Sequence, residues 1–450
     1  MGDGDPLNWP KWKKVVNLLV VAFHAMMATF TAAAIQSAFS EIAEDFEITV
    51  QKASYLTSLV VLVLGVAPFF WRPLSHVYGR RPIFLISLLC SLIGNIGCAV
   101  SPSYATMGLC RAITAFFISP ASSLGSAIVS ETFFRNEQAH YMGIWTAMVT
   151  LGVPVAPLIF GFVAMRVGYR WIYWILALTN AVQIILHILL CPETRYNPSK
   201  TDPKTSFRRQ YFQFKRLDPT PIKIKDFLYP LSLATRPSVM IPAVSYSMIF
   251  LWGSVMTTFE IPQLLPEKFG FNTQQVGLQY IGIILGTVIG EQIGGLMSDK
   301  WMAIRKHRSG VTPPPEYRLW LSYPGHLLTL TGVVVFLVQL DRAGDRWNIT
   351  PIIGAAIAAA GNQIVTTVSI TYAVDCFRED SASVGVFITF VRQVWGFIGP
   401  FWIPQMIENL GLQGSTAITT ATIVAISILP MMLLQWRGKN WKGRLSTDDS

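Results

Sequence analysis

Long runs of apolar residues dominate the chain and constrain its fold more than any other feature. A helix needs about 20 apolar residues to cross the hydrocarbon core of a bilayer, and twelve segments approach or exceed that length. Lipid cannot satisfy an open backbone, so such segments must form helices or closed barrels. They lie near residues 15–40, 53–71, 82–101, 104–130, 140–163, 171–191, 238–262, 274–298, 319–340, 350–374, 382–407 and 414–436.

Charged residues are few, and their distribution predicts how the chain crosses the membrane. They make up 13% of the 450 residues, roughly half the share in a soluble domain. With the N-terminus inside, six of the 35 Lys and Arg fall outside, two lie within apolar segments and the remaining 27 fall inside. This positive-inside pattern predicts that both termini are cytoplasmic. The formal net charge of +10 is therefore a topology signal, and we expect no nucleic-acid partner.

One hydrophilic stretch divides the apolar segments into six plus six. Residues 192–237 contain ten Lys and Arg and no run of membrane length, which predicts a cytoplasmic linker. We therefore expect an all-α integral membrane protein with twelve transmembrane helices in two pseudo-symmetric six-helix bundles. The predicted parts are a cytoplasmic N-terminus (1–14), a first bundle (15–191), the linker (192–237), a second bundle (238–436) and a cytoplasmic tail (437–450).

Short matches indicate that the two halves are related. Leu74-Ser75-His76 at the end of the second segment corresponds to Met297-Ser298-Asp299 at the end of the eighth, 223 residues later. Ala156-Pro157 in the fifth corresponds to Gly399-Pro400 in the eleventh, 243 residues later. Parallel repeats with a midplane site between the halves are a known transporter architecture.

The loop between the second and third apolar segments carries a recognisable pattern. It runs from Pro73 to Pro82 and resembles the loop between helices 2 and 3 of the major facilitator superfamily, roughly Gly-x-Leu-x-Asp-Arg-x-Gly-Arg-Arg. The residues that fit are Leu74, Gly79, Arg80 and Arg81, and those that depart are Arg72, His76 and Val77. The resemblance implies that fold, with this loop acting as a latch that stabilises the outward-facing state.

Further motifs are similar to those of the fungal drug:proton antiporter branch with twelve spans. Arg111 fits the start of the helix 4 motif, which implies a role in proton coupling. Gly152, Pro157 and Gly161 fit the helix 5 antiporter motif, in which Ala156 and Phe160 replace glycines. The motifs outside the spans are Asp5-Pro6-Leu7-Asn8-Trp9-Pro10 and Pro192-Glu193-Thr194-Arg195.

The latch residues that the resemblance implies lie in both halves. His76 cannot act as the family's Asp because it carries no negative charge, so we expect Asp299 to carry more of the latch. Glu291 lies eight residues before Asp299, hence on the same helical face, and a gating role is predicted for it. The predicted latch and gate residues are Arg80, Arg81, His76, Gly295, Asp299 and Glu291.

Ionisable residues inside the apolar segments are candidates for function, because a charge at a helix centre costs about 2.5–3.5 kcal/mol. Arg111 and Glu260 are predicted to couple protons or to bind substrate, although Glu260 also fits an interfacial position just before Pro262. His24 is a further candidate because an imidazole titrates near neutral pH. A core histidine is the alternative.

Two other embedded charges favour structural roles. Asp375 stands beside Arg378, which predicts an ion pair in a loop. Arg392 lies near the middle of its segment and needs a carboxylate or carbonyl partner.

Uncharged polar residues line one face of the segment near 350–374. Asn362 and Thr366 are four residues apart, as are Gln363 and Thr367, so they share a face. The resemblance places this helix at the central cavity, where Asn362, Gln363 and Thr366 would contact substrate together with Trp252. Aromatic and hydroxyl groups around sparse charge suit an amphiphilic organic molecule. Hydrogen bonding to another helix is the alternative.

Together these observations predict a proton-coupled secondary transporter that exports a drug, toxin or secondary metabolite by alternating access. An uptake permease or symporter for a small organic cation or nutrient is the alternative, because the helix 5 motif is imperfect. No enzyme is expected, since the sequence has no Gly-x-x-x-x-Gly-Lys-Ser/Thr and its five cysteines lack metal-binding spacing. We expect no cofactor and no metal, a monomer in the plasma membrane, and substrate, protons and lipid as partners.

Overall fold

The structure is a computed structural model that describes residues 5–134, 137–195, 216–217, 221, 223–310, 314–344, 346–377 and 380–437. Within these ranges the side chains at positions 139, 296, 299 and 309 are not described. All regular secondary structure in the described part is helical. The fold is therefore of the predicted class, an all-α integral membrane protein.

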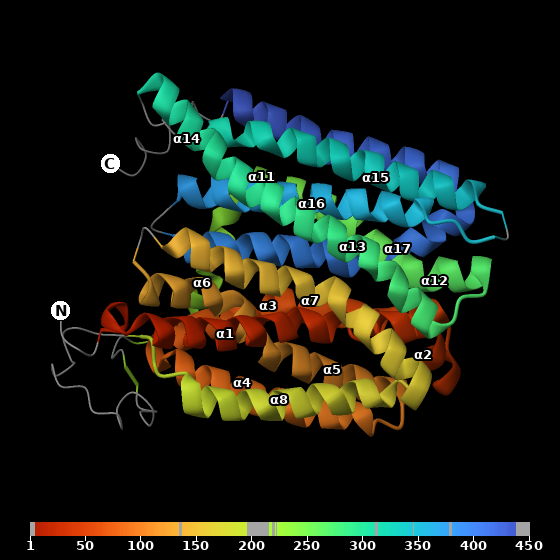
Figure 1. Cartoon of the computed structure of the whole chain (residues 1–450), viewed down its shortest axis with the longest axis horizontal. Coiled ribbons are helices and arrows are strands. Elements are labelled where there is room, and N and C mark those ends of the chain that lie inside the picture. The colour runs from red at the N-terminus through yellow and green to blue at the C-terminus, as the bar shows by residue number, and fades with distance from the viewer. Residues whose placement is uncertain are drawn as a thin grey trace. The chain divides into compact units, whose positions relative to one another are not determined.

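The helices form two compact units (Figure 1). Unit 1 comprises Met1–Ile35 and Leu59–Tyr229, and unit 2 comprises Gln36–Ser58 and Pro230–Ser450. The helix α3 (Val50–Tyr78) contributes to both units. The other helices of unit 1 are α1 (Lys11–Ala33), α4 (Arg80–Ala99), α5 (Tyr104–Ile118), α6 (Pro120–Thr132), α7 (Gln138–Val167), α8 (Arg170–Leu190) and α10 (Ile224–Leu228). Those of unit 2 are α2 (Phe39–Asp45), α11 (Pro237–Phe250), α12 (Thr257–Phe269), α13 (Thr273–Gln292), α14 (Ser298–Ser309), α15 (Ser322–Arg342), α16 (Thr350–Cys376) and α17 (Ser381–Thr422).

Eleven helical stretches in the described part are long and apolar enough to cross a membrane. The difference from the predicted twelve lies near the C-terminus, where the segments 382–407 and 414–436 form one stretch, Ser381–Arg437. Gly411 interrupts its backbone with a φ of +67°, a left-handed conformation that glycine adopts without steric cost. The two predicted segments therefore meet at a kink, and the structure does not confirm twelve separate spans.

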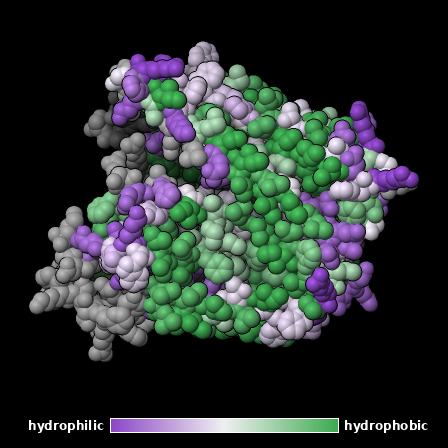
Figure 2. All heavy atoms as spheres, in the orientation of Figure 1, coloured by the Kyte–Doolittle hydropathy of each residue, from purple (hydrophilic) through white to green (hydrophobic). Residues whose placement is uncertain are grey.

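Apolar side chains cover the outside of the helices. Leu109, Leu178 and Leu189 are 63%, 66% and 64% exposed. Hydrophobic residues lie over the middle of the visible helices, and hydrophilic residues gather at their ends (Figure 2). Exposed apolar surface of this extent marks contact with lipid or with another protein, and the length of the helices fits a bilayer.

The helix α1 packs against α5, α6, α7 and α8 in unit 1. Gly152 on α7 makes one of these contacts close, because a Cβ atom there would overlap Thr29 and come within 2.6 Å of the Met26 carbonyl oxygen. Thr29 Oγ1 donates to the Val149 carbonyl oxygen at 2.7 Å. The predicted helix 5 motif therefore forms part of the packing between α1 and α7, and α7 continues through Pro157.

In unit 2 the helix α16 packs against both α13 and α15. A row of glycines on α13 faces it, and a Cβ atom at Gly286 or Gly290 would overlap the backbone of α16 at Ala356 or Ala360. Small residues at such positions let two helices approach closely inside a membrane. The separation of α13 and α16 is therefore set by main-chain contact.

Three helices of unit 2 contain a π-helical turn. These turns are Leu251–Met256 between α11 and α12, Ile293–Met297 between α13 and α14, and Ile423–Ile428 after α17. The described part of unit 1 contains none. π turns are rare and occur frequently at functional sites. Two of the three hold predicted site residues, Trp252 in the first and Gly295 in the second.

Candidate functional site

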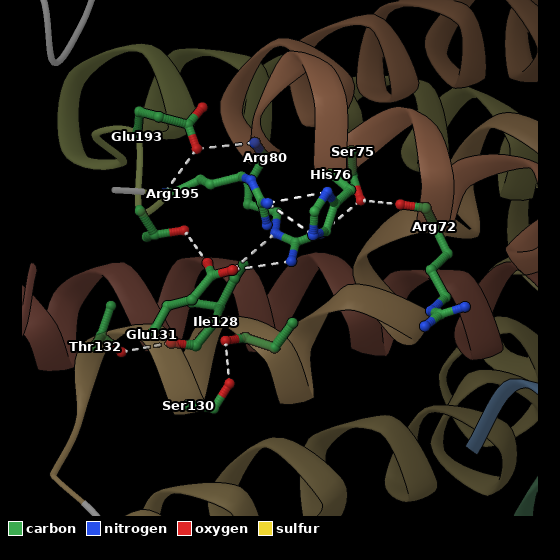
Figure 3. A network of polar contacts seen from close by, with 12 residues as sticks. Arg72, Ser75, His76, Arg80, Ile128, Ser130, Glu131, Thr132, Glu193 and Arg195 are labelled. Atoms are coloured by element: carbon green, nitrogen blue, oxygen red, sulfur yellow. Dashed lines mark hydrogen bonds and ion pairs between the residues drawn. The ribbon is translucent and has the colours of Figure 1, made fainter. Parts of the chain in front are cut away.

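Arg80, at the start of α4, is the centre of an ionic network in unit 1 (Figure 3). Its Nη2 atom lies 2.9 Å from Glu131 Oε1, and its Nη1 atom donates to Ser75 Oγ at 2.5 Å. Thr194 Oγ1 donates to the second carboxylate oxygen of Glu131 at 2.8 Å. The network therefore joins the ends of α3 and α6, the start of α4 and the segment after α8.

Glu193 holds the N-terminus of α4. Its two carboxylate oxygens accept from the backbone N–H groups of Arg80 at 2.9 Å and Arg81 at 3.0 Å, a position where the helix dipole favours an anion. Gly79 has a φ of +97°, and a Cβ atom there would lie 2.5 Å from Glu193 Oε2, so a side chain at position 79 would displace the carboxylate. Burial raises the pKa of Glu193, against the lowering effect of backbone N–H donors from Arg80, Arg195 and Arg81.

Arg81 and His76 occupy different places around this network. The Arg81 guanidinium donates to the carbonyl oxygens of His187 at 2.9 Å and Ile188 at 3.0 Å, where the C-terminal end of α8 favours a cation. His76 lies at the exposed edge, with Arg195 Nη2 2.9 Å from its Nδ1 atom and 2.7 Å from its Nε2 atom. His76 therefore does not stand in the place of a carboxylate, which Glu131 and Glu193 supply instead.

Unit 2 repeats the arrangement with other residues. Arg318, just before α15, donates to Ser298 Oγ at 2.6 Å, and its Nη2 atom lies 3.4 Å from Asp375 Oδ2. Ser298 is the residue that the sequence repeat pairs with Ser75. Each unit thus contains a serine, an arginine and a carboxylate in contact. The predicted partner of Asp375, Arg378, lies outside the described residues.

Arg111 is buried in unit 1 where α5 meets α1 and α8. It is 2% exposed, and its Nη1 atom donates to the Tyr173 hydroxyl at 3.3 Å. Its Nη2 atom donates to the carbonyl oxygens of Ala32 at 3.2 Å and Thr31 at 3.5 Å. These contacts place a cation inside the unit and tie the end of α1 to α5 and α8.

Glu260 on α12 is a buried carboxylate in unit 2. It is 2% exposed, and no described residue donates a hydrogen bond to it or forms an ion pair with it. The neighbouring backbone is fixed, because the Tyr280 hydroxyl donates to the Thr258 carbonyl oxygen at 2.6 Å. Burying a carboxylate is costly unless it gains a proton or a cationic partner. Glu260 is therefore suited to bind one or the other.

The polar stripe of α16 contacts Glu291 on α13. Gln363 Nε2 donates to Glu291 Oε2, and Thr367 Oγ1 lies 3.5 Å from the same oxygen. Asn362 and Thr366 are one helical turn apart, each 9% exposed. The structure thus brings Glu291 together with the predicted substrate residues.

Trp252 lies in the first π turn and is fully buried. Its ring packs edge-to-face on Trp402 with the centroids 5.4 Å apart. A Cβ atom at the adjacent Gly253 would lie 3.3 Å from the Asn362 Cβ atom, so the π turn packs directly on the stripe of α16. Neither Trp252 Nε1 nor Asn362 Oδ1 has a hydrogen-bond partner among the described residues. An unpaired donor and acceptor in this region suit a ligand with both groups.

The remaining predicted residues lie apart from these clusters. His24 is fully buried in α1, and Gly161 lies in α7 beyond Pro157. Gly295 has open space where a Cβ atom would stand. The side chain of Asp299 lies outside the described part, so its latch role stays a prediction.

Arg392 contacts aromatic side chains of α11. Arg392 donates to the Tyr246 hydroxyl at 3.0 Å and lies over the Phe250 ring, a partner set that the sequence did not indicate. Among the described residues no three His, Cys, Asp or Glu side chains could hold a metal ion.

Sequence reasoning did not single out Glu131, Glu193 or Arg318 as site residues. Glu131 lies 51 residues from Arg80 and Glu193 lies 113 residues from it, so the pairing depends on how the helices meet. The available signal was the Pro-Glu-Thr motif, whose Glu193 accepts the two N–H groups at the start of α4.

Two helical units with an apolar exterior, matching ionic networks and buried ionisable groups define a multi-pass membrane transporter. The family model for the Major Facilitator Superfamily matches residues 20–400, and the chain belongs to this family. It is accordingly a secondary transporter and not an enzyme.

Similar proteins include several fungal transporters at low identity. The MFS transporter cpaT of Aspergillus oryzae is 28% identical over 95% of this chain and 87% of its own length. The efflux pump radE of Floropilus chiversii is 25% identical over 96% and 82%. The efflux pump FUBT of Fusarium oxysporum is 26% identical over 95% and 73%.

Proposed function

We propose that the chain is a proton-coupled exporter of a small amphiphilic organic molecule, such as a drug, toxin or secondary metabolite. The observation that carries this proposal is Glu260, a carboxylate that is 2% exposed and has no described partner. A residue that must bind either a proton or a cation can exchange one for the other. Such competition for one carboxylate is the simplest basis for antiport.

The contacts near the π turn support an organic substrate. Trp252 and Trp402 offer apolar aromatic surface, while Asn362 Oδ1 and Trp252 Nε1 offer one unpaired acceptor and one unpaired donor. Binding sites for organic molecules combine such surfaces with few polar groups. Glu291, which contacts Gln363 and Thr367, is a second candidate carboxylate of unit 2 beside Glu260.

The two ionic networks support alternating access. Each consists of side chains from different helices, Arg80 with Glu131 in unit 1 and Arg318 with Asp375 in unit 2. Ion pairs between helix ends can break and re-form when helices move, and so they suit a gate. The positive-inside pattern supports placing these networks at the cytoplasmic end, with both termini inside. We also propose that the protein is a monomer in the plasma membrane.

Export is also supported by the relatives, because radE and FUBT are named as efflux pumps. An uptake symporter is the competing function, because Ala156 and Phe160 replace glycines of the helix 5 antiporter motif. The two functions differ in the direction of the proton gradient that drives accumulation.

The test is transport by the purified protein in proteoliposomes, with a panel of amphiphilic compounds and imposed pH gradients. Antiport predicts accumulation when the lumen is acidic, because protons leave as substrate enters. Accumulation only with an acidic exterior would establish symport instead. Movement of substrate that ignores either gradient would refute proton coupling.

Glu260→Gln tests the carboxylate itself. The amide has a similar shape but can neither exchange a proton nor pair with a cation, so accumulation driven by the pH gradient should be lost and exchange of labelled for unlabelled substrate should weaken as well. Glu267→Gln, a change of the same kind on α12, is the matched control and should retain both activities. Unchanged gradient-driven accumulation by Glu260→Gln would remove the basis of the proposal.

A further inference from the structure

Unit 1 contains a second set of buried polar side chains, separate from the ionic network. Ser87, Ser91 and Asn95 lie at four-residue spacing on one face of α4, and they are 0–1% exposed. Asn180, Gln183 and His187 lie three and four residues apart on one face of α8, and they are also 0–1% exposed. His24 of α1 joins them, with its Nε2 atom 3.3 Å from Ser87 Oγ and its ring centroid 5.2 Å from that of His187. These seven residues are called the polar seam.

The helices α4 and α8 run antiparallel along the seam. Arg81 at the start of α4 contacts the last carbonyl oxygens of α8, and Arg170 at the start of α8 donates to the carbonyl oxygens of Ala99, the last residue of α4, and of Ser101 just after it. His24 contacts both Ser87 and His187, and the buried amides of α4 and α8 follow from there toward the Arg170 end of the two helices.

Most polar atoms of the seam have no partner in the described structure. Those without one are His24 Nδ1, Asn95 Nδ2 and Oδ1, Asn180 Nδ2, Gln183 Nε2 and Oε1, and His187 Nε2. The serines differ, since Ser87 Oγ donates to the Phe117 carbonyl oxygen and Ser91 Oγ lies 3.5 Å from that of Thr114. Buried polar groups are nearly always hydrogen-bonded. Water fills this role in most proteins, with about three hydrogen bonds for each buried molecule.

Charged and titratable groups stand at both ends of the seam. Arg81 donates to the His187 carbonyl oxygen at one end, and Arg111 with Tyr173 lies at the other. Cysteines stand near both ends as well: Cys98, three residues after Asn95 on α4, lies near Arg111 and Cys110, and the Cys191 carbonyl oxygen accepts from Arg81. No described Asp or Glu contacts a residue of the seam.

At the corresponding place in unit 2 the polar side chains are hydrogen-bonded to protein atoms. There His326 on α15 contacts Ser245 Oγ at 3.1 Å and the Ser322 carbonyl oxygen at 2.7 Å, and Ser245 Oγ lies 2.7 Å from Ser427 Oγ. The buried face of α15 then continues with Thr329, a glycine and apolar residues, with no amide. Protein atoms therefore satisfy the polar groups around His326 in unit 2, whereas His24 and His187 in unit 1 each keep a ring nitrogen without a partner.

We propose that the polar seam binds a chain of water molecules, and that this chain carries the transported proton through unit 1 between the Arg81 end and the Arg111 end. The proposal deepens the proposed function, because it rests on proton coupling for its second part. Asn95, Asn180 and Gln183 hold the water molecules through their unpaired amide atoms. His24 and His187 each accept a proton on one ring nitrogen and release it from the other. No atom is consumed, since each water molecule gains one proton and passes one on.

The water chain is tested first by X-ray footprinting of the purified protein, without substrate. Radicals formed from bound water oxidise the side chains that touch it, even buried ones. His187 and His326 are each 1% exposed, so they form a matched pair within one molecule. We expect oxidation of His187 to exceed that of His326 severalfold. Equal oxidation of the two would refute the water chain, whatever the protein transports.

Two variants tie the oxidation to the seam. Gln183→Met keeps the length of the side chain on α8 and removes its amide. Asn95→Leu makes the equivalent change on α4. Oxidation of His187 should fall severalfold in each, while Ser427→Ala in unit 2 should leave it unchanged. Retained oxidation of His187 in both seam variants would refute the assignment, and the milder Gln183→Met keeps the test decisive if Asn95→Leu does not fold.

The proton path is tested by the ratio of two activities in proteoliposomes. Gln183→Met should reduce gradient-driven accumulation severalfold while exchange of labelled for unlabelled substrate stays normal. A parallel loss of both activities, or of neither, would refute proton movement through the seam. A wild-type protein that ignores the pH gradient would refute the proposed function, and footprinting would still decide whether water occupies the seam.

Discussion

Unit 1 and unit 2 bring equivalent helices together in the same way but fill the space between them differently. Both join a serine, an arginine and a carboxylate at the helix ends, Ser75–Arg80–Glu131 and Ser298–Arg318–Asp375. Away from those ends, amide and imidazole groups between α4 and α8 of unit 1 have unpaired atoms, whereas His326 of α15, at the corresponding place in unit 2, is paired with Ser245 and Ser322. The glycines of α13, which pack on the main chain of α16, lie between a different pair of helices. The halves thus share their ionic networks and differ in their interiors. This difference suggests a division of labour, with close packing and substrate contacts in unit 2 and a hydrated interior in unit 1.

The largest expected effect separates the two ionic networks. Arg80→Ala should lower the free energy of unfolding by about 3 kcal/mol, because it leaves Glu131 without its cation in a buried place. Arg318→Ala should cost less, about 2 kcal/mol, since its ion pair is longer, 3.4 Å against 2.9 Å. Denaturant unfolding of the purified protein in detergent measures both. A larger loss of unfolding free energy for Arg318→Ala would reverse the expected order of the two ionic networks.

The next effect separates the packing of the two interiors. Gly286→Ala should cost about 2 kcal/mol, because the new methyl group would overlap the backbone of α16 at Ala356. Gly97→Ala in unit 1 should cost less than about 1 kcal/mol, since its nearest neighbour is the half-buried Cys110 side chain and no backbone atom lies close. The same unfolding assay measures both variants. Similar losses would show that main-chain contact does not distinguish unit 2.

A smaller effect compares the serine–histidine contacts. Ser245→Ala should cost about 1 kcal/mol, because it removes the hydroxyl that contacts both His326 and Ser427. Ser87→Ala should cost less, because water in the polar seam can replace the hydroxyl beside His24. Thermal unfolding of the two variants gives the comparison. An equal or larger loss for Ser87→Ala would contradict a hydrated seam.

The smallest effect is a pH dependence at Glu193, the carboxylate that accepts from the first N–H groups of α4. Burial raises its pKa in the folded protein above the ordinary value of 4.5. The stability that protonated Glu193 provides is therefore present below that value and lost as the pH rises through the folded pKa. Relative to Glu193→Gln, which cannot titrate, the wild type should gain stability on mild acidification. Unfolding curves of the two proteins that shift in parallel with pH would show that Glu193 does not titrate in this way.

Much of the fold was predictable from hydropathy, because lipid excludes every spanning structure except helices and barrels. The two-fold repeat was also visible, since Ser75 and Ser298 occupy matching positions in both the sequence and the networks. The exception was the C-terminal pair of segments, which Gly411 joins without a loop. A kink at glycine leaves no polar residues to mark the end of a span.

The site was less predictable, and Glu291 shows why. The spacing of eight residues assigned Glu291 and Asp299 to one helical face, but the π turn Ile293–Met297 lies between them. A π turn departs from the period of 3.6 residues on which that assignment rests. Glu291 instead contacts Gln363 on another helix. The partners of Arg80 were hidden for a different reason, since they come from segments that only tertiary packing brings together.

The exchanged places of serine and histidine bear on the ancestry of the chain. Unit 1 has histidine on its first helix and serine on its third, His24 and Ser87, whereas unit 2 has Ser245 and His326. If one gene segment was duplicated to make both halves, at least two substitutions separate these pairs. A route through two histidines would overfill the site, but a route through two serines would leave a gap that solvent can occupy. A wet intermediate is thus the more accessible evolutionary path, and the water proposed for unit 1 would be a remnant of it.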